Sequence, residues 1–180
     1  MIREAMAADV PGMLEIYGYY VKETAVSFEY EIPTVEEFTR RLEEHKAVYP
    51  WLVWEEEGEI LGYAYAGRAF ERAAYSWNAE ISCYLKRKGT GMGRKLYGII
   101  EEILLRQGVR KVYALVTSAN PGSLAFHKAI GYGELLTYRE VGFKFGAWYD
   151  ITWLEKQLCP LGEPKNFPIP WKNLKISLDK

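Results

Sequence analysis

The segment from Trp77 to Gly108 constrains this chain most, because it predicts a strand, a glycine-rich loop and a helix in immediate succession. Apolar and polar residues alternate from Trp77 to Leu85, which is the period-two pattern of a strand whose two faces differ. After Gly93 the apolar residues recur at the spacing of an amphipathic helix, which we expect to end at Gly108. The chain must therefore fold around a strand that leads directly into a helix.

The loop between this strand and this helix has the composition of an anion-binding turn. A glycine-rich turn at a helix start leaves backbone N–H groups unpaired, and the helix dipole favours negative charge there. Glycine also lets a ligand approach the backbone, and Lys86, Arg87 and Lys88 add positive charge. Arg94 stands where the dinucleotide fingerprint has its third glycine, and the P-loop spacing is not met either. A pyrophosphate site is one interpretation, and a plain glycine turn before a surface helix is the alternative.

Composition predicts one domain in a reducing compartment. With 180 residues, of which 49% are hydrophobic, the chain can bury a substantial core. Its formal net charge of −1 gives no electrostatic attraction to nucleic acid or to an anionic membrane, so we expect neither partner. Only Cys83 and Cys159 occur, which argues against a disulfide framework. We find no signal peptide and no membrane-spanning run, and we expect a cytoplasmic protein.

The remaining elements follow from periodicity and from turn residues. They are a strand at 1–5, a helix starting near Asp9, an extended segment at 24–31, a helix capped by Thr34, strands at 51–54 and 60–66, a buried strand at 112–117, a short helix capped by Asn120, and strands at 135–143 and 148–158. Four prolines after Cys159 indicate an extended tail, docked by Phe167 and Trp171. We expect a domain at 1–158 followed by a proline-rich tail at 159–180.

This order of elements resembles the GNAT superfamily of N-acetyltransferases, and lysine-x-x-glycine-x-glycine at 88–93 resembles its acyl-CoA loop. Several separated stretches are similar to the phosphinothricin, methionine sulfone and methionine sulfoximine acetyltransferases of that superfamily. These stretches are 49–53, 62–67, Arg72 with 74–75, 79–80, 90–93, 96–97, 127–132 and 141–144 with 146–150. The resemblance implies an α/β (α+β) chain with the GNAT fold, a mixed and mostly antiparallel central sheet with about four flanking helices. It also implies acetyl-CoA as co-substrate and a homodimer.

For acetyl-CoA, the resemblance implies a site made by the end of the central strand, the glycine loop and the start of the short helix. Its members are Cys83, Tyr84, Leu85, Lys88, Gly89, Thr90, Gly91, Met92, Gly93, Arg94, Asn120 and Ser123. A backbone N–H near Tyr84 or Leu85 would stabilise the oxyanion. The connection between Leu85 and Gly91 is shorter than is usual in the family and lacks its usual proline and its usual Gln or Arg. Lys88 lies nearest to that missing side chain.

Two residues are candidates for proton transfer. Glu80 is a carboxylate in the middle of a strand among aromatic and apolar neighbours, where desolvation should raise its pKa. The resemblance implies that Glu80 is the general base, whereas the alternative is a glutamate that faces solvent or pairs with Arg72. At His127 the resemblance implies a catalytic or orienting histidine, and a helix-packing histidine is the alternative. His45 is expected to be exposed, and with two histidines in all we expect no metal site.

For the amino-acid acceptor, the resemblance implies Phe28, Arg72, Tyr75 and Ser82. A guanidinium can hold two oxygens of a carboxylate or phosphinate at once, which suits Arg72 for an anionic acceptor. A loop arginine that faces solvent is the alternative. We therefore expect an acetyl-CoA-dependent N-acetyltransferase for the α-amino group of a small amino acid such as phosphinothricin, methionine sulfone or methionine sulfoximine. The alternatives are an acetyltransferase for a polyamine or a protein N-terminus, and a CoA-binding module without catalysis.

Overall fold

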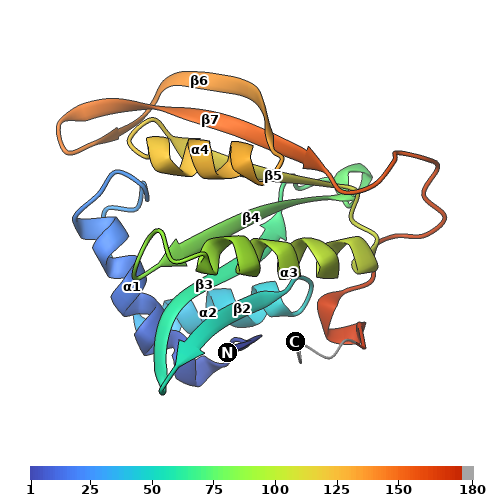
Figure 1. Cartoon of the computed structure of the whole chain (residues 1–180), viewed down its shortest axis with the longest axis horizontal. Helices are drawn as coiled ribbons and strands as arrows, with labels where there is room; N and C mark the ends of the chain where they lie inside the picture. Colours follow the sequence, from blue (N-terminus) through green and yellow to red (C-terminus); the bar gives the residue numbers. More distant parts are fainter. Residues whose placement is uncertain (176–180) are drawn as a thin grey trace.

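A seven-stranded sheet runs through the computed structural model, which describes residues 1–175 (Figure 1). The strand order is β1-β2-β3-β4-β5-β7-β6. The strands are β1 (Ile2–Glu4), β2 (Trp51–Glu56), β3 (Glu59–Arg68), β4 (Asn78–Leu85), β5 (Lys111–Thr117), β6 (Gly133–Lys144) and β7 (Ala147–Gln157). Within the described residues β4 and β5 pair in parallel, and the other neighbouring strands pair antiparallel. The prediction of a mixed, mostly antiparallel sheet is confirmed.

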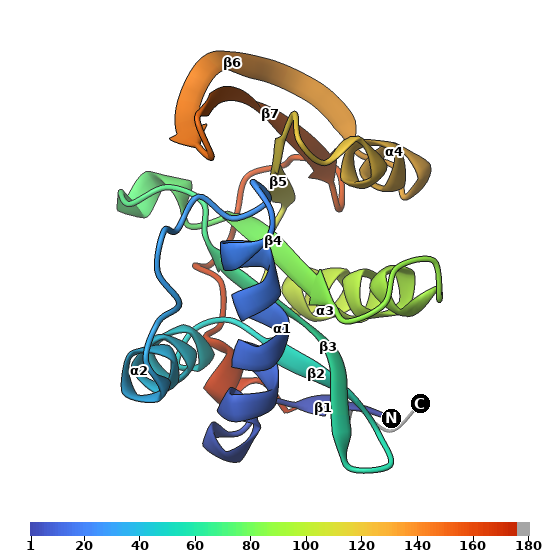
Figure 2. The ribbon, with the colours of Figure 1, turned by 90° about the vertical axis from the view of Figure 1, so that its left-hand side faces the viewer.

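Four α-helices cover the two faces of the sheet. They are α1 (Val10–Lys22), α2 (Val35–Lys46), α3 (Met92–Gln107) and α4 (Pro121–Ala129). Figure 2 shows α1 and α2 on one side of the strands and α3 with α4 on the other. Each side has its own hydrophobic core, one built on α3 with Ile81 of β4 and the other on α1 and α2 with Tyr63 of β3. No helix among residues 1–175 is long and apolar enough to cross a membrane.

The central strand β4 has the two faces that its alternation predicts. Ala79 and Ile81 are buried in the core beneath α3, whereas Tyr84 packs in the aromatic cluster on the side of α1 and α2. Because side chains alternate along a strand, Glu80 and Ser82 share the face of Tyr84. The general-base candidate is thus on the side of the sheet away from α3.

The segment at 24–31 differs from the prediction, because it forms a bent loop rather than an extended segment. The ammonium of Lys144, near the end of β6, draws this loop in by donating hydrogen bonds to the carbonyls of Val21, Thr24 and Ser27, at 2.7, 3.0 and 2.6 Å. The Lys144 side chain is only 2% exposed. The loop between α1 and α2 is therefore tied to the β6–β7 hairpin, far away in the sequence.

The start of α1 and the proline-rich tail are each held by specific contacts. Asp9 stands at the start of α1, but its carboxylate accepts two hydrogen bonds from Arg3 instead of capping the helix. The tail is docked as expected: Trp171 is buried, its N–H donates to the carbonyl of Val48, and Phe167 stacks on Trp77. The predicted tail continues to 180, and its last five residues lie outside the described range.

Candidate active site

The glycine loop and the start of α3 form the kind of anion-binding turn that the sequence predicts. Gly89 and Gly91 adopt positive φ angles of 77° and 81°, a region that favours glycine. Gly91 is the N-cap of α3 and has no side chain that could satisfy the helix. The first backbone N–H groups of α3 have no carbonyl one turn earlier to bind, so they are available to an anion.

A cavity of about 360 Å³ lies beside this turn, between β4, α3 and α4. Eight of the predicted site residues line it: Cys83, Leu85, Lys88, Gly89, Gly93, Asn120, Ser123 and His127. Tyr20, Val26, Tyr97 and Phe126 also line it, although the sequence analysis did not select them. The residues present fit an acyl-CoA. The backbone N–H groups of the glycine turn suit its phosphates, and the largely apolar cavity beside the turn suits the chain that carries the thioester.

Four further members of the predicted acetyl-CoA set lie near this cavity without lining it. Thr90 and Gly91 belong to the loop, and Met92 is buried at the first position of α3. The guanidinium of Arg94 donates to the carbonyl of Ala129, at the end of α4, over 3.3 Å. Arg94 is therefore placed to join the two helices that border the cavity.

Strands β4 and β5 separate next to this cavity. They are paired only from Asn78 opposite Lys111 to Glu80 opposite Tyr113. Beyond that point the carbonyls of Ile81 and Leu85 accept hydrogen bonds from side-chain hydroxyls of other elements. Since the N–H and C=O of one residue point to the same side of a strand, the N–H groups of residues 81, 83 and 85 face the gap. Tyr84 has the opposite parity and faces β3, so Leu85 or Cys83 fits the oxyanion role and Tyr84 does not.

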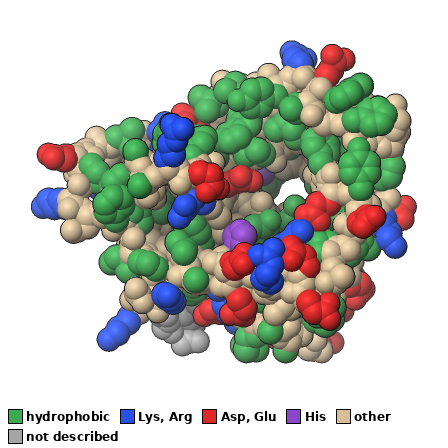
Figure 3. Space-filling view, turned by 180° about the vertical axis from the view of Figure 1, so that it is seen from behind, with side chains coloured by type: hydrophobic (Ala, Val, Ile, Leu, Met, Phe, Trp, Pro, Cys, Tyr) green, Lys and Arg blue, Asp and Glu red, His purple; other side chains and the backbone are tan. Residues whose placement is uncertain are grey.

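A small space at the gap shares lining residues with the acyl-CoA cavity and with a cavity on the opposite face of β4. This space, of about 70 Å³, is lined by Ser82, Cys83 and His127 among others. Ser82 also lines a cavity of about 170 Å³ together with His45, Tyr65, Gly67, Arg68 and Glu80. Seen from behind, on the side of α2, the surface is hollowed between apolar side chains above and charged ones below (Figure 3). An acceptor on this side and a thioester on the other could meet at the gap.

Burial sets the chemistry of Glu80. Its side chain lies mostly within the protein, and desolvation raises the pKa of its carboxyl above the ordinary value. A carboxylate with a raised pKa is a stronger base, which suits the removal of a proton from an ammonium group. Cys83, by contrast, is an inert thiol, because burial raises its pKa to about 12.

His127 is 4% exposed, and hydrogen-bond partners lie at both of its ring nitrogens. Its Nδ1 lies 2.8 Å from the carbonyl oxygen of Ser123, which can only accept, so Nδ1 carries the proton. Nε2 then accepts from the hydroxyl of Tyr97 at 2.8 Å. Desolvation lowers the pKa of His127, which favours this neutral form. The hydroxyl of Tyr97, rather than an imidazole N–H, is therefore the donor of this pair.

Three of the four predicted acceptor residues lie outside these cavities. Arg72 and Tyr75 are exposed on the loop between β3 and β4, where Tyr75 packs against Phe70. The ring of Phe28 lies in the α1–α2 loop against Gly142 of β6. Ser82 is the fourth, and it lines the Glu80 cavity. Arg68 also lines this cavity, but it pairs with Ala79 in the ladder, on the other face of β4 from Glu80, and its guanidinium lies near Glu71.

The expectation that His45 is merely exposed is wrong. The side chain is half-buried and lines the Glu80 cavity. The sequence contained a signal for this, because Phe38, Leu42 and His45 fall at the spacing of one helix face. Among residues 1–175, no group of three or more His, Cys, Asp or Glu side chains is arranged to hold a metal ion.

Comparison with known proteins places this geometry in a family. A model described as an acetyltransferase (GNAT) domain matches residues 2–153. The phosphinothricin N-acetyltransferase of Streptomyces viridochromogenes is 35% identical over 157 residues, which cover 86% of each chain. The L-methionine sulfoximine/L-methionine sulfone acetyltransferase of Salmonella typhimurium is 31% identical over 87% of this chain and 94% of its own.

Solved structures agree with the sequence matches. An acetyltransferase from Salmonella typhimurium, described with its cofactor acetyl-CoA, superposes with a TM-score of 0.87 at 30% identity. That match covers 92% of this chain and 97% of the other. The two chains therefore share the same overall fold over nearly their whole length.

Proposed function

The chain belongs to the GNAT acetyltransferase family, acetyl-CoA-dependent acyltransferases, and from that premise we propose that it acetylates the α-amino group of a small amino acid. The acceptor is one whose side chain carries a tetrahedral oxygenated centre, such as phosphinothricin, methionine sulfone or methionine sulfoximine. Two relatives that span most of the chain carry these substrates in their names. The observation that carries the proposal is the half-buried Glu80 carboxyl, whose pKa desolvation raises and which lies where β4 and β5 separate.

The residues on the α3 side hold the acetyl donor in this proposal. The N–H groups at the start of α3 and the ammonium of Lys88 bind the phosphates, and Asn120 and Ser123 line the channel below them. When bound, acetyl-CoA supplies a thioester carbonyl at the gap. The N–H of Leu85, which faces the gap, donates to the oxygen of that carbonyl as negative charge develops on it.

On the other side, Glu80 takes a proton from the acceptor's ammonium group, directly or through a water molecule, and frees the lone pair that attacks the carbonyl. Tyr97 lines the same channel as Cys83, and its hydroxyl proton, donated to Nε2 of His127 in the resting form, turns to the departing thiolate in this proposal. His127 acts here by orienting Tyr97. His127 does not itself donate a proton, because its Nε2 carries none in the neutral form.

Two alternatives remain as outcomes of the test. A polyamine or protein N-terminus would be the acceptor of a related acetyltransferase, and a CoA-binding module would show no turnover. Arg68, at the edge of the Glu80 cavity with its guanidinium near Glu71, adds a positive charge that disfavours a polycation. The test measures thiol release and acetylated product with acetyl-CoA and a panel of methionine sulfone, methionine sulfoximine, phosphinothricin, spermidine and an alanine-initiated peptide. Turnover with spermidine or the peptide alone would overturn the acceptor class, and release with none of them would overturn the enzyme assignment.

The arginine that holds the acceptor's anionic oxygens can be identified in the same assay. Resemblance favours Arg72, and the cavity favours Arg68. Loss of a charge-assisted hydrogen bond costs about 1.5–3 kcal/mol, or roughly 10- to 150-fold in the Michaelis constant. We expect Arg68→Ala or Arg72→Ala to raise the Michaelis constant for methionine sulfone by this amount and to leave that for acetyl-CoA unchanged. If neither does so, the anionic clamp is absent.

We further propose a cytoplasmic homodimer. Its support is the apolar surface of β6 and β7, whose large exposed side chains are Leu135, Leu136, Tyr138, Val141, Phe143 and Trp148. Exposed apolar patches of this kind mark interfaces, and β6 is an edge strand. Light scattering should give twice the monomer mass for the wild type. The variant Leu136→Glu should give the mass of one monomer. Both cysteines are free thiols, which suits a reducing compartment.

A further inference from the structure

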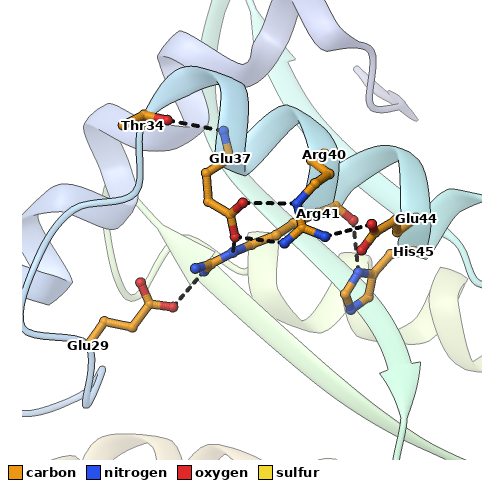
Figure 4. Close-up of polar contacts among 7 residues, drawn as sticks. All are labelled: Glu29, Thr34, Glu37, Arg40, Arg41, Glu44 and His45. Atoms are coloured by element: carbon orange, nitrogen blue, oxygen red, sulfur yellow. Dashed lines mark hydrogen bonds and ion pairs between the residues drawn. The ribbon is translucent and has the colours of Figure 1, made fainter.

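His45 is held in one orientation above the sheet by contacts with α2 and with neighbouring aromatic rings. It lies one turn after Arg41 in α2, and its Nδ1 is 2.8 Å from the backbone carbonyl of Arg41 (Figure 4). The ring also stands edge-on to Trp51 of β2 and Tyr65 of β3, with both ring centroids 5.5 Å away. A histidine on a polar helix needs none of these contacts if it serves only solubility.

The hydrogen bond to Arg41 determines which nitrogen of His45 is free. A carbonyl only accepts, so Nδ1 carries the proton and Nε2 carries a lone pair. Nε2 is directed at the sheet, because a Cβ atom built on Gly67 would lie 3.4 Å from it. Gly67 is the partner of Glu80 in the antiparallel ladder between β3 and β4. The absence of a side chain at Gly67 leaves the basic nitrogen of His45 and the carboxyl of Glu80 facing one cavity.

The groups around His45 favour transfer of a proton to it. Arg68 and Tyr65 of β3 and Glu80 of β4 share its cavity, and burial raises the pKa of Tyr65 to about 12, so that hydroxyl does not ionise. On α2 itself the neighbouring charges are neutralised by ion pairs. Arg41 pairs with Glu29 and Glu37, and Arg40 pairs with Glu37 and Glu44. Glu80 is therefore the carboxyl from which His45 can receive a proton.

We propose that His45 is the exit for the proton that Glu80 removes from the acceptor amine. The proposal deepens the proposed function and rests on it. In each turnover the ammonium gives one proton to the Glu80 carboxylate, and the free amine attacks the thioester carbonyl. As the C–S bond breaks, the second proton lost from the nitrogen leaves with the thiolate as the CoA thiol. The protonated Glu80 then passes its proton, directly or through one water molecule, to Nε2 of His45, and the imidazolium releases a proton to solvent. No electron transfer is involved, and the enzyme returns to its starting charge.

His45 is on this account a positioning residue for the proton on Glu80, and it does not touch the substrate. A buried carboxyl with a raised pKa holds its proton well, so regeneration of the base becomes a slow step when the exit is missing. This predicts a specific kinetic signature. His45→Gln keeps a side chain of similar length that cannot be protonated, and it should lower kcat about 10-fold or more, at the low end of general acid–base effects. The Michaelis constants for both substrates should stay within about twofold.

Imidazole in the buffer and the pH profile distinguish proton exit from packing. For His45→Gln, added imidazole should restore kcat, and the loss should shrink as the pH rises and hydroxide takes the proton from Glu80. A purely structural role would give neither effect. Glu44→Gln, an exposed change one residue earlier on α2, serves as the matched control and should equal wild type. Unchanged kcat in His45→Gln, or a loss that neither imidazole nor pH alters, would overturn the proposal while leaving the acetyltransferase activity established.

A second measurement does not depend on turnover. The imidazole signals of His45 are recorded by NMR in wild type, in Glu80→Gln and in Glu44→Gln at one pH. If the two groups share the cavity as proposed, Glu80→Gln should move these signals more than Glu44→Gln, which gives the size of an unrelated charge effect. Signals that Glu80→Gln moves no more than Glu44→Gln does would overturn the proton exit even if no acceptor in the panel were acetylated.

Discussion

Gly142→Ala should separate the acceptor side of the site from the acetyl-CoA side. A Cβ atom at Gly142 would lie 2.0, 2.4 and 2.6 Å from three ring atoms of Phe28. Carbon atoms pack at about 3.5–4.0 Å, so the ring must move by roughly 1.5 Å or more. Such overpacking typically costs about 1–3 kcal/mol, which corresponds to roughly 2–12 °C in the unfolding midpoint of a chain of this size. Because Phe28 is a predicted acceptor residue, the Michaelis constant for the amino acid should rise and that for acetyl-CoA should not.

Gly133→Ala is the matched control, because Gly133 is also in β6 and a Cβ atom there meets nothing within 4 Å. Thermal unfolding followed by circular dichroism and steady-state kinetics are measured on both variants. Phe28→Leu should reduce the cost of Gly142→Ala in a double-mutant cycle, because a smaller side chain can give way. Equal midpoints and equal Michaelis constants for Gly142→Ala and Gly133→Ala would refute the close packing of the α1–α2 loop on β6.

Three further outcomes follow from single features of the structure. Gly91→Val should weaken acetyl-CoA binding at least ~10-fold in calorimetry, because valine disfavours a φ of 81° and screens the backbone, whereas Gly98→Val on the outer face of α3 should not. Lys144→Met should destabilise the fold by at least about 1.5–3 kcal/mol in denaturant unfolding, since it leaves three loop carbonyls without their donor. Glu80→Gln should stabilise the protein at neutral pH and not below pH 4.5. Desolvation raises the pKa of Glu80 in the folded state, so the ionised carboxylate lowers the free energy of unfolding once the pH is above its folded-state pKa. A difference in unfolding midpoint between Glu80→Gln and wild type that is the same at all pH values would contradict the prediction for Glu80.

The alternation along β4 and the glycine turn at Gly91 could be predicted because both are local consequences of residue type. A strand with one apolar and one polar face is predicted by apolar and polar residues that alternate along it. A turn at positive φ favours glycine. The order of helices and strands followed from the same rules. The start of α1 near Asp9 was predicted, whereas the pairing of the Asp9 carboxylate with Arg3 was not.

The acceptor side could not be predicted in the same way, because long-range contacts decide it. No residue near Thr24 indicates that Lys144, 120 residues away, will donate a hydrogen bond to the Thr24 carbonyl. The pairing of Tyr97 with His127 joins α3 to α4, and a tyrosine on an apolar helix face predicts burial without naming its partner. His45 shows the converse case. Its position on the buried face of α2 was readable, but the polar residues around it suggested an exposed side chain.

The central claim is that the half-buried carboxylate of Glu80, at the gap between β4 and β5, deprotonates the acceptor of an acetyl-CoA-dependent reaction. Glu80→Gln tests it most directly when calorimetry of acetyl-CoA binding and turnover with methionine sulfone are measured on the same preparation. We expect unchanged affinity for acetyl-CoA, because Glu80 lies on the opposite face of the sheet from the glycine turn. Turnover should fall roughly 10²- to 10⁴-fold, the usual contribution of a positioned general base. Turnover within about threefold of wild type from about pH 6 to 9 would contradict this account of the reaction.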